Sequence, residues 1–246
     1  MTRKSTAPRR SALHFEKIPL AKVVKKIAPT PAAPGRKKET DEPTAEPGAR
    51  PRECSDHFHG VQFYEDPDAL CRIVGNFVGE GFELGGLALV IATPDHAAKI
   101  DDCLRARGID VDDLKQERRL VTLDARETLQ LFMVDGMPNP GAFRWVVGSA
   151  LKSVRVGREH CTIRAYGEMV DLLWKDGMEA AAIRLETLWN QLAATHDFKL
   201  LCGYSMGNFY KGAAIEEIHG QHSHLVGMNG DTTALPDGQS ESAPPH

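Results

Sequence analysis

The chain has 246 residues, of which 41% are hydrophobic and 26% are charged, a balance typical of a globular protein. No apolar run approaches the roughly 20 residues of a membrane-spanning helix, which excludes an integral membrane protein. The five cysteines are widely spaced and form no C-x-x-C pair. This pattern disfavours a disulfide framework or a zinc ribbon, and it predicts a protein of the reducing cytoplasm.

The charge divides the chain into two parts. Residues 1–53 carry a net charge of +7 and the remainder carries −11. The first 53 residues also hold 8 of the 15 prolines and one aromatic residue, Phe15. The burial of so few apolar groups cannot offset the conformational entropy that the chain would lose on folding. Residues 1–54 are therefore predicted to be a disordered basic arm. The acidic remainder disfavours nucleic acid as a partner, except through this arm.

A short amphipathic pattern lies within the arm, over residues 20–28. Apolar residues at 20, 23, 24 and 27 share one side and lysines occupy the other. Pro19 and Pro29 limit a helix there to about nine residues, too short to persist alone. Two readings stay open: a solubilising linker, or a peptide that docks on an acidic partner, a membrane surface or DNA.

Strand and helix signals alternate after Cys54. Asp66 followed by Pro67 is typical of a helix start, and the apolar run 87–92 is typical of a buried parallel strand. Strands are predicted over 57–64, 87–92, 120–123, 160–166 and 198–204, with helices over 67–78, 94–108, 125–133, 140–154, 168–175 and 181–192. The pattern predicts an α/β domain over 55–227 with a mostly parallel sheet flanked by helices, and a disordered tail over 228–246.

Two glycine-containing motifs could suggest chemistry. No G-x-x-x-x-G-K-[ST] loop occurs, and the glycines at 79, 81, 85 and 86 follow a helix rather than precede one, so nucleotide binding through a standard loop is rejected.

Gly203-Tyr-Ser205-Met-Gly207 matches the G-x-S-x-G elbow of serine hydrolases. The nearest downstream acids and histidines lie within about twenty residues of Ser205, which leaves no room for further strands to carry them; they are Glu216, Glu217, His219, His222 and His224. A hydrolase that uses Ser205 is kept as an alternative only.

Histidines cluster at two places. His57 and His59 share one face of a predicted strand, and the stretch after residue 218 contains His219, His222 and His224. Imidazoles suit zinc, copper or nickel, but no cysteine or acid stands beside them at a recognised ligand spacing. Polar histidines with local hydrogen bonds are therefore favoured, and neither a metal ligand nor a cofactor is predicted.

The most specific constellation is the stretch Arg164-Ala-Tyr166-Gly-Glu168-Met. It places an arginine on a strand, an aromatic ring at its end and a carboxylate at the start of the next helix. Asp171 shares a helix face with Glu168, and Glu186 similarly neighbours Asn190 four residues on. Spacing alone favours ion pairs that tie a strand to a helix, while a small polar pocket is the functional alternative.

Four segments together resemble the MEDS family of sensory domains, found in methanogen and methylotroph regulators that include the dichloromethane-responsive repressor. They are R-A-Y-G-E-M at 164–169, L-E-T-L-W-N at 185–190, L-L-C-G-Y at 200–204 and G-F-E-L-G at 81–85. The strand with His57 and His59 and the stretch His222-Ser-His224 also resemble the two ends of that domain. The resemblance covers about residues 55–227.

The resemblance implies a fold related to the RecA/KaiC class without its phosphate loop. It implies a prokaryotic signal-transduction sensor that binds a small hydrocarbon-derived or C1 ligand and is not an enzyme. The ligand-binding residues carried over from it are His59, Arg164, Tyr166, Glu168, Glu186, Cys202 and Tyr204. The family typically fuses this domain to a DNA-binding, kinase or anti-sigma module, so output here is expected to pass to a separate partner protein. A RecA-like scaffold that binds only a protein partner is a second alternative.

Overall fold

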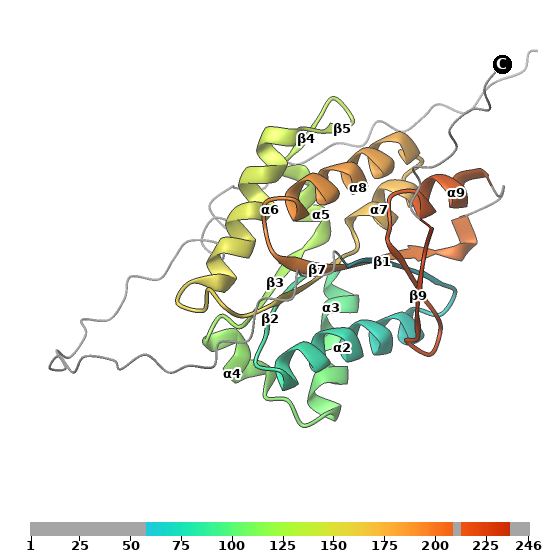
Figure 1. The fold of residues 1–246 in the computed structure, drawn as a ribbon. Coiled ribbons are helices and arrows are strands. Elements are labelled where there is room, and N and C mark those ends of the chain that lie inside the picture. The colour runs from blue at the N-terminus through green and yellow to red at the C-terminus, as the bar shows by residue number, and fades with distance from the viewer. Residues whose placement is uncertain (1–57, 209–212, 237–246) are drawn as a thin grey trace, which may run out of the picture.

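The structure, a computed structural model, describes residues 58–208 and 213–236. Its centre is a seven-stranded sheet in the order β3-β2-β6-β7-β1-β8-β9 (Figure 1). All neighbouring strands in it are parallel except β8 and β9. The strands are β1 (His59–Tyr64), β2 (Leu87–Ala92), β3 (Leu120–Asp124), β6 (Ile163–Gly167), β7 (Phe198–Ser205), β8 (His224–Val226) and β9 (Thr232–Ala234).

Helices cover both faces of the sheet (Figure 1). One face carries α2 (Pro67–Glu83), α3 (Pro94–Ala106) and α4 (Val111–Gln116); the other carries α5 (Ala125–Gln130), α6 (Pro140–Arg155), α7 (Met169–Lys175) and α8 (Glu179–Ala193). Each face has its own apolar core. The predicted class, a mostly parallel sheet flanked by helices, is confirmed. Helix α9 (Ala213–His219) leads into β8, and the short turn η1 (Met206–Asn208) follows β7.

The polar residues that precede two of the predicted helices cap those helices in the structure. The Asp66 carboxylate accepts hydrogen bonds from the backbone N–H groups of Asp68 and Ala69, which caps α2. Asn139 caps α6 in the same way through the N–H of Ala142. Every residue of β2 is buried, as its uninterrupted apolar sequence predicts for a strand covered on both faces.

Several elements differ from the sequence-based prediction. The helix predicted over 94–108 ends at Ala106, and α4 follows it. A hairpin of β4 (Met133–Val134) and β5 (Met137–Pro138) occupies the end of another predicted helix. The tail predicted to be disordered from residue 228 contains the strand β9, which pairs with β8.

Predictions for the arm over 1–54, its amphipathic segment 20–28, His57 and residues 237–246 lie outside the described residues. Within the described residues, no helix has the length and apolar character needed to cross a membrane.

Two glycines allow close packing where a side chain would not fit. A Cβ at Gly81 on α2 would lie 2.9 Å from Cδ of Arg164 on β6. A Cβ at Gly203 on β7 would lie 3.1 Å from the Tyr166 hydroxyl and 3.2 Å from Cδ1 of Leu70. The first glycine of the G-x-S-x-G sequence therefore accommodates the neighbouring strand and helix, which is a packing role.

Candidate functional site

A cluster of polar side chains lies buried between the sheet and α8. His59 comes from β1 and Cys202 from its parallel neighbour β7, where Cys202 pairs with Val61. Side chains alternate between the faces of a strand, so both point toward α8. Glu186 lies on the buried side of α8, and His222 lies between α9 and β8. The residue exposures are 1% for His59, 0% for Glu186 and Cys202, and 6% for His222.

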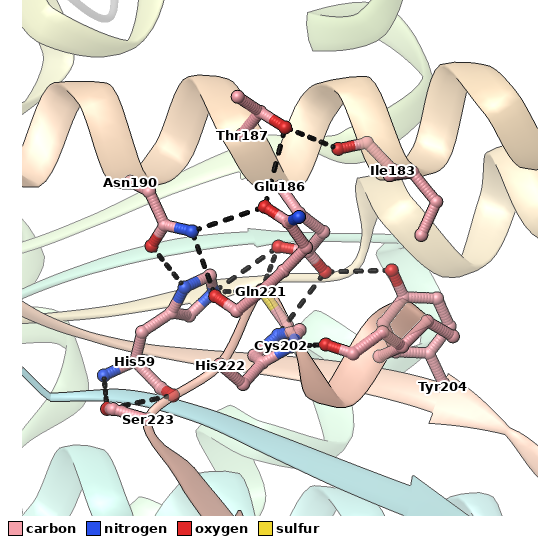
Figure 2. Close-up of polar contacts among 11 residues, drawn as sticks. His59, Ile183, Glu186, Thr187, Asn190, Cys202, Tyr204, Gln221, His222 and Ser223 are labelled. Atoms are coloured by element: carbon pink, nitrogen blue, oxygen red, sulfur yellow. Dashed lines mark hydrogen bonds and ion pairs between the residues drawn. The ribbon is translucent and has the colours of Figure 1, made fainter. Parts of the chain in front are cut away.

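The reactive atoms of this cluster converge. Nε2 of His59 lies 3.3 Å from Oε2 of Glu186 and 3.4 Å from Sγ of Cys202. The Cys202 Sγ lies 3.5 Å from the same carboxylate oxygen. Nε2 of His222 lies 3.4 Å from the other carboxylate oxygen, Oε1. Figure 2 shows these groups gathered around Glu186, with the Tyr204 hydroxyl donating to Oε1 at 2.8 Å.

Surrounding groups orient both imidazoles. The amide nitrogen of Asn190 donates to the Gln221 carbonyl at 2.8 Å, which turns Oδ1 of Asn190 toward Nδ1 of His59, also at 2.8 Å. Nδ1 of His222 lies 2.7 Å from the carbonyl of Ile218. Because a carbonyl and an amide oxygen only accept, both Nδ1 atoms carry the hydrogen. Each Nε2 atom is therefore directed at the centre of the cluster (Figure 2).

Burial and neighbouring charge set the protonation of the cluster. Burial alone would raise the pKa of Glu186, but the neighbouring imidazoles of His222 and His59 outweigh it and hold that pKa well below its ordinary value. Burial, together with the neighbouring His222, lowers the pKa of His59. Burial and then Glu186 raise the pKa of the Cys202 thiol well above its ordinary value. The cluster therefore combines a carboxylate, a neutral imidazole at His59 and a thiol.

The seven predicted site residues do not line one pocket. Four of them meet in this cluster: His59, Glu186, Cys202 and Tyr204. Arg164 and Tyr166 point to the opposite face of the sheet, the α2 side, and Glu168 lies at the carboxyl edge of the strands. The prediction did not include His222 or Asn190. Their signals were present in the histidine cluster after residue 218 and in the spacing of Asn190 from Glu186.

Arg164 ties a strand to a helix. Its guanidinium pairs with Glu80 at 3.0 Å, donates to the Phe77 carbonyl and lies 5.0 Å from the centre of the Phe77 ring. These partners all belong to α2. The contacts correspond to the structural reading of the R-A-Y-G-E-M stretch. Tyr166, two residues on, is fully buried, and its hydroxyl has no hydrogen-bond partner among the described residues.

Two carboxylates tie the carboxyl ends of the strands together. Glu168 accepts from the backbone N–H of Thr93 at 2.9 Å and lies 2.9 Å from Nδ1 of His96. Asp171 accepts from the Tyr64 hydroxyl at 2.8 Å and from the Ser205 N–H at 2.9 Å. Asp171 also pairs with Lys175 at 2.6 Å.

We expect Asp171→Asn to lower the free energy of unfolding by about 1–3 kcal/mol, because the new amide keeps one acceptor and turns its N–H₂ toward groups that already donate. Chemical denaturation of the full chain measures this. Asp176→Asn is the control, since within the described part of the chain Asp176 pairs with the half-exposed Arg126 alone. Equal losses in the two variants would contradict the role of Asp171.

A cavity of about 320 Å³ opens beside the end of β1. Its lining is mainly apolar and comprises Gln62, Phe63, Tyr64, Glu65, Asp66, Ala69, Leu70, Ile73, Met206 and Met228. Gln62 is 2% exposed, and its amide nitrogen donates to the Phe63 carbonyl at 2.8 Å. Its Oε1 is buried and has no hydrogen-bond partner among the described residues.

The first turn of α2 disfavours phosphate. Its N-terminus is where a helix dipole and free N–H groups could bind an anion. Here the Asp66 carboxylate takes those N–H groups, and the exposed Glu65 adds a second negative charge beside it.

Ser205 has no hydrogen-bonded base among the described residues. Its backbone N–H binds Asp171, and within the described part of the chain no histidine is hydrogen-bonded to its hydroxyl. A serine nucleophile needs a base within hydrogen-bond reach. The hydrolase alternative therefore finds no general base there.

The fold and the buried cluster define an α/β domain with a polar site sealed between its sheet and a helix. The family model of the MEDS domain, "MEthanogen/methylotroph, DcmR Sensory domain", matches residues 58–223. The chain belongs to the MEDS family, as its sequence motifs predicted, and a sensory role is the function of that family. No curated protein matches the chain.

Among solved structures, the chain is similar to a KaiC-like protein from the hyperthermophilic archaeon Pyrococcus horikoshii OT3. The identity is 10% and the TM-score is 0.46, and the match covers 68% of this chain and 70% of that one.

Proposed function

We propose that this chain is a prokaryotic signal-transduction sensor that binds a small, hydrocarbon-derived or C1 ligand in the cavity beside β1. Its MEDS family membership supports the sensory role. The observation that carries the ligand proposal is a mainly apolar cavity whose lining includes Gln62, a residue with an unpartnered buried Oε1 among the described residues. An apolar lining with few placed polar groups is the usual character of a small-molecule site.

The chemistry of the cavity narrows the ligand class. A buried acceptor without a donor is costly, so a ligand that brings one O–H or N–H group gains a hydrogen bond that the free protein lacks. The remaining lining favours an apolar body, and the carboxylates of Glu65 and Asp66 at the rim disfavour anions. A short alcohol or a related C1 derivative meets these requirements.

The cavity adjoins the buried cluster through one side chain. Phe63 lines the cavity, and its ring centre lies 6.1 Å from that of Tyr204 and 5.5 Å from that of His219. Tyr204 in turn donates to Glu186. Movement of Phe63 on ligand binding would therefore reach both the cluster and α9. The seven residues carried over from the family stay a prediction for ligand binding, and four of them lie on this route.

The test is thermal unfolding of the full chain with two panels: C1 alcohols and halogenated C1 compounds, and nucleotides with magnesium. A ligand at 100 times its Kd adds about 2.7 kcal/mol, which raises the Tm by about 5–10 °C for a domain of this size. We expect a shift with the first panel only. A shift with nucleotides only contradicts the proposed ligand class, and no shift with either panel favours the protein-binding scaffold.

We expect Ala69→Leu to abolish that shift, because the larger side chain fills the cavity from α2 without changing the helix. Ala98→Leu is the matched control, since Ala98 is an exposed residue of α3. The same calorimetric or fluorescence unfolding curve measures both variants. An unchanged ligand response in Ala69→Leu would place the ligand elsewhere.

For output, we propose a separate partner protein such as a kinase, an anti-sigma factor or a transcription regulator in the cytoplasm. The described residues form one sensory domain, and the basic charge of residues 1–53 suits an acidic partner. Removal of residues 1–53 should weaken capture of that partner and leave ligand binding intact.

A further inference from the structure

We propose that His59, Glu186, Cys202 and His222 form a binding site for one zinc ion. One ligand atom from each residue, namely two imidazole nitrogens, the thiol sulfur and a carboxylate oxygen, lies within 4.8 Å of the others, and all four residues are buried. This inference goes beyond the proposed function, and it does not depend on the ligand of the β1 cavity.

The spacing of the cluster fits a tetrahedral ion. Zinc binds nitrogen and oxygen at about 2.0–2.2 Å and sulfur at about 2.3 Å, so two ligand atoms of a tetrahedral site lie about 3.3–3.6 Å apart. The distances among His59 Nε2, Glu186 Oε2 and Cys202 Sγ are 3.3, 3.4 and 3.5 Å. These three atoms therefore match one face of the tetrahedron, and His222 Nε2 offers the fourth position.

Both histidines direct their inner nitrogen at the centre of the cluster. Each Nδ1 atom carries a hydrogen that is used outside the cluster, by Asn190 for His59 and by Ile218 for His222. Each Nε2 atom therefore faces the Glu186 carboxylate, whose oxygens accept from the Tyr204 hydroxyl and the Cys202 thiol. Nε2 of His222 has no hydrogen-bond partner among the described residues and lies 3.4 Å from Glu186 Oε1. A cation at the centre would give both Nε2 atoms a partner.

The donor set and its surroundings suit zinc. Two imidazoles, one thiolate and one carboxylate combine the nitrogen, sulfur and oxygen ligands that zinc accepts. The thiolate and the carboxylate together balance a divalent charge, so the filled site would be neutral in its apolar surroundings. Hydrogen bonds from the outer nitrogen of each ligating histidine to an amide or carbonyl oxygen are typical of metal sites. Asn190 and Ile218 supply them here.

The ion would join parts of the chain that are distant in sequence. His59 and Cys202 lie on neighbouring strands, Glu186 lies on α8 and His222 lies beyond α9. Coordination by His222 would fasten the α9–β8 connection to the sheet, next to the His219 that contacts Phe63. The site thus has a structural character, with four protein ligands and no open position.

The test measures zinc retained by the untagged full chain after gel filtration in metal-free buffer. We expect about one zinc per chain, and at least a tenfold loss in Cys202→Ser and in His222→Gln. The matched controls Cys103→Ser and His160→Gln should retain the metal, since neither residue belongs to the cluster. Zinc in the unaltered chain that is no higher than in Cys202→Ser would overturn the proposal.

A spectroscopic measurement on the unaltered chain covers the case in which the variants fail to fold. Zinc X-ray absorption should show one sulfur at about 2.3 Å and the remaining ligands at about 2.0–2.1 Å. Cobalt substitution should give a thiolate-to-cobalt charge-transfer band. Retained zinc with only nitrogen and oxygen ligands would overturn the site. A chain that binds neither zinc nor cobalt would also overturn the proposal.

Discussion

Glu186→Ala is expected to lower the free energy of unfolding by about 3–5 kcal/mol, measured by chemical denaturation of the full chain with a chelator present. Removal of one partner from a buried charged network leaves the others uncompensated. The Tyr204 hydroxyl and the Cys202 thiol would lose their acceptor, and the two histidines would lose the neighbouring negative charge. None of these groups can reach water, because the cluster is sealed between the sheet and α8.

Glu186→Gln separates hydrogen bonding from charge at the same position. The amide oxygen can still accept from Tyr204, and the new N–H₂ group can donate to Nε2 of His59. With the chelator present we expect a loss of only about 1–2 kcal/mol. Without the chelator the same variant should retain far less zinc than the unaltered chain, because an amide is a poor substitute for a carboxylate ligand. Glu217→Gln, at an exposed position of α9, is the control for both measurements.

A Glu186→Ala loss below about 1 kcal/mol would contradict the burial and connectivity of the cluster. Such a result would mean that water reaches the site or that the neighbouring side chains rearrange to pair with one another. A Glu186→Gln loss as large as that of alanine, in chelator, would show instead that the negative charge itself holds the cluster together.

The regular elements could be predicted from the sequence because their signals are local. Asp66 with Pro67 and Asn139 with Pro140 marked helix starts, and the structure has caps at both places. The apolar run of β2 predicted a doubly covered strand with the observed bounds. Short elements such as β4, β5 and β9 carry two or three residues each, too few for a periodic pattern to develop.

The buried cluster could be predicted only in part, because its members meet through the order of the strands. His59 and Cys202 are 143 residues apart and come together because β7 lies beside β1. Local spacing does not specify that order. In the sequence, His222 stands beside His219 and His224, with no cysteine or acid at a recognised ligand spacing. Its actual partners come from a distant strand and from α8.

Arg164 shows why residues that are close in sequence need not belong to one site. For the R-A-Y-G-E-M stretch, spacing alone favours ion pairs and a small polar pocket is the functional alternative, but adjacent residues on a strand face opposite sides of the sheet. Arg164 and Tyr166 consequently point away from Cys202 and Tyr204. The glycine that admits Arg164 lies on α2, at Gly81. Its role is visible only once the helix and the strand are placed together.

Trp189→Ala is expected to lower the free energy of unfolding by about 3–5 kcal/mol, the usual cost of emptying a large aromatic site in a core. The indole is 1% exposed, and its ring meets Phe143 edge-on at 5.3 Å and Phe198 at 5.9 Å. It also lies against Gly167 at the end of β6, where a Cβ would be 3.5 Å from Cζ2. Trp189 therefore fixes the distance between α8 and the sheet, and so the position of Glu186 one turn away.

Trp145→Ala is the matched control, because Trp145 is 53% exposed on α6. Its loss should stay within about 0.5 kcal/mol. Trp189→Phe should cost less than alanine, since it keeps an aromatic ring and removes an indole N–H that has no partner among the described residues. Comparable losses of unfolding free energy in Trp189→Ala and Trp145→Ala would contradict the role of Trp189 in packing α8 against the sheet. A destabilised Trp189→Ala chain that still retains full zinc would show that the four ligands hold their geometry without support from α8 packing.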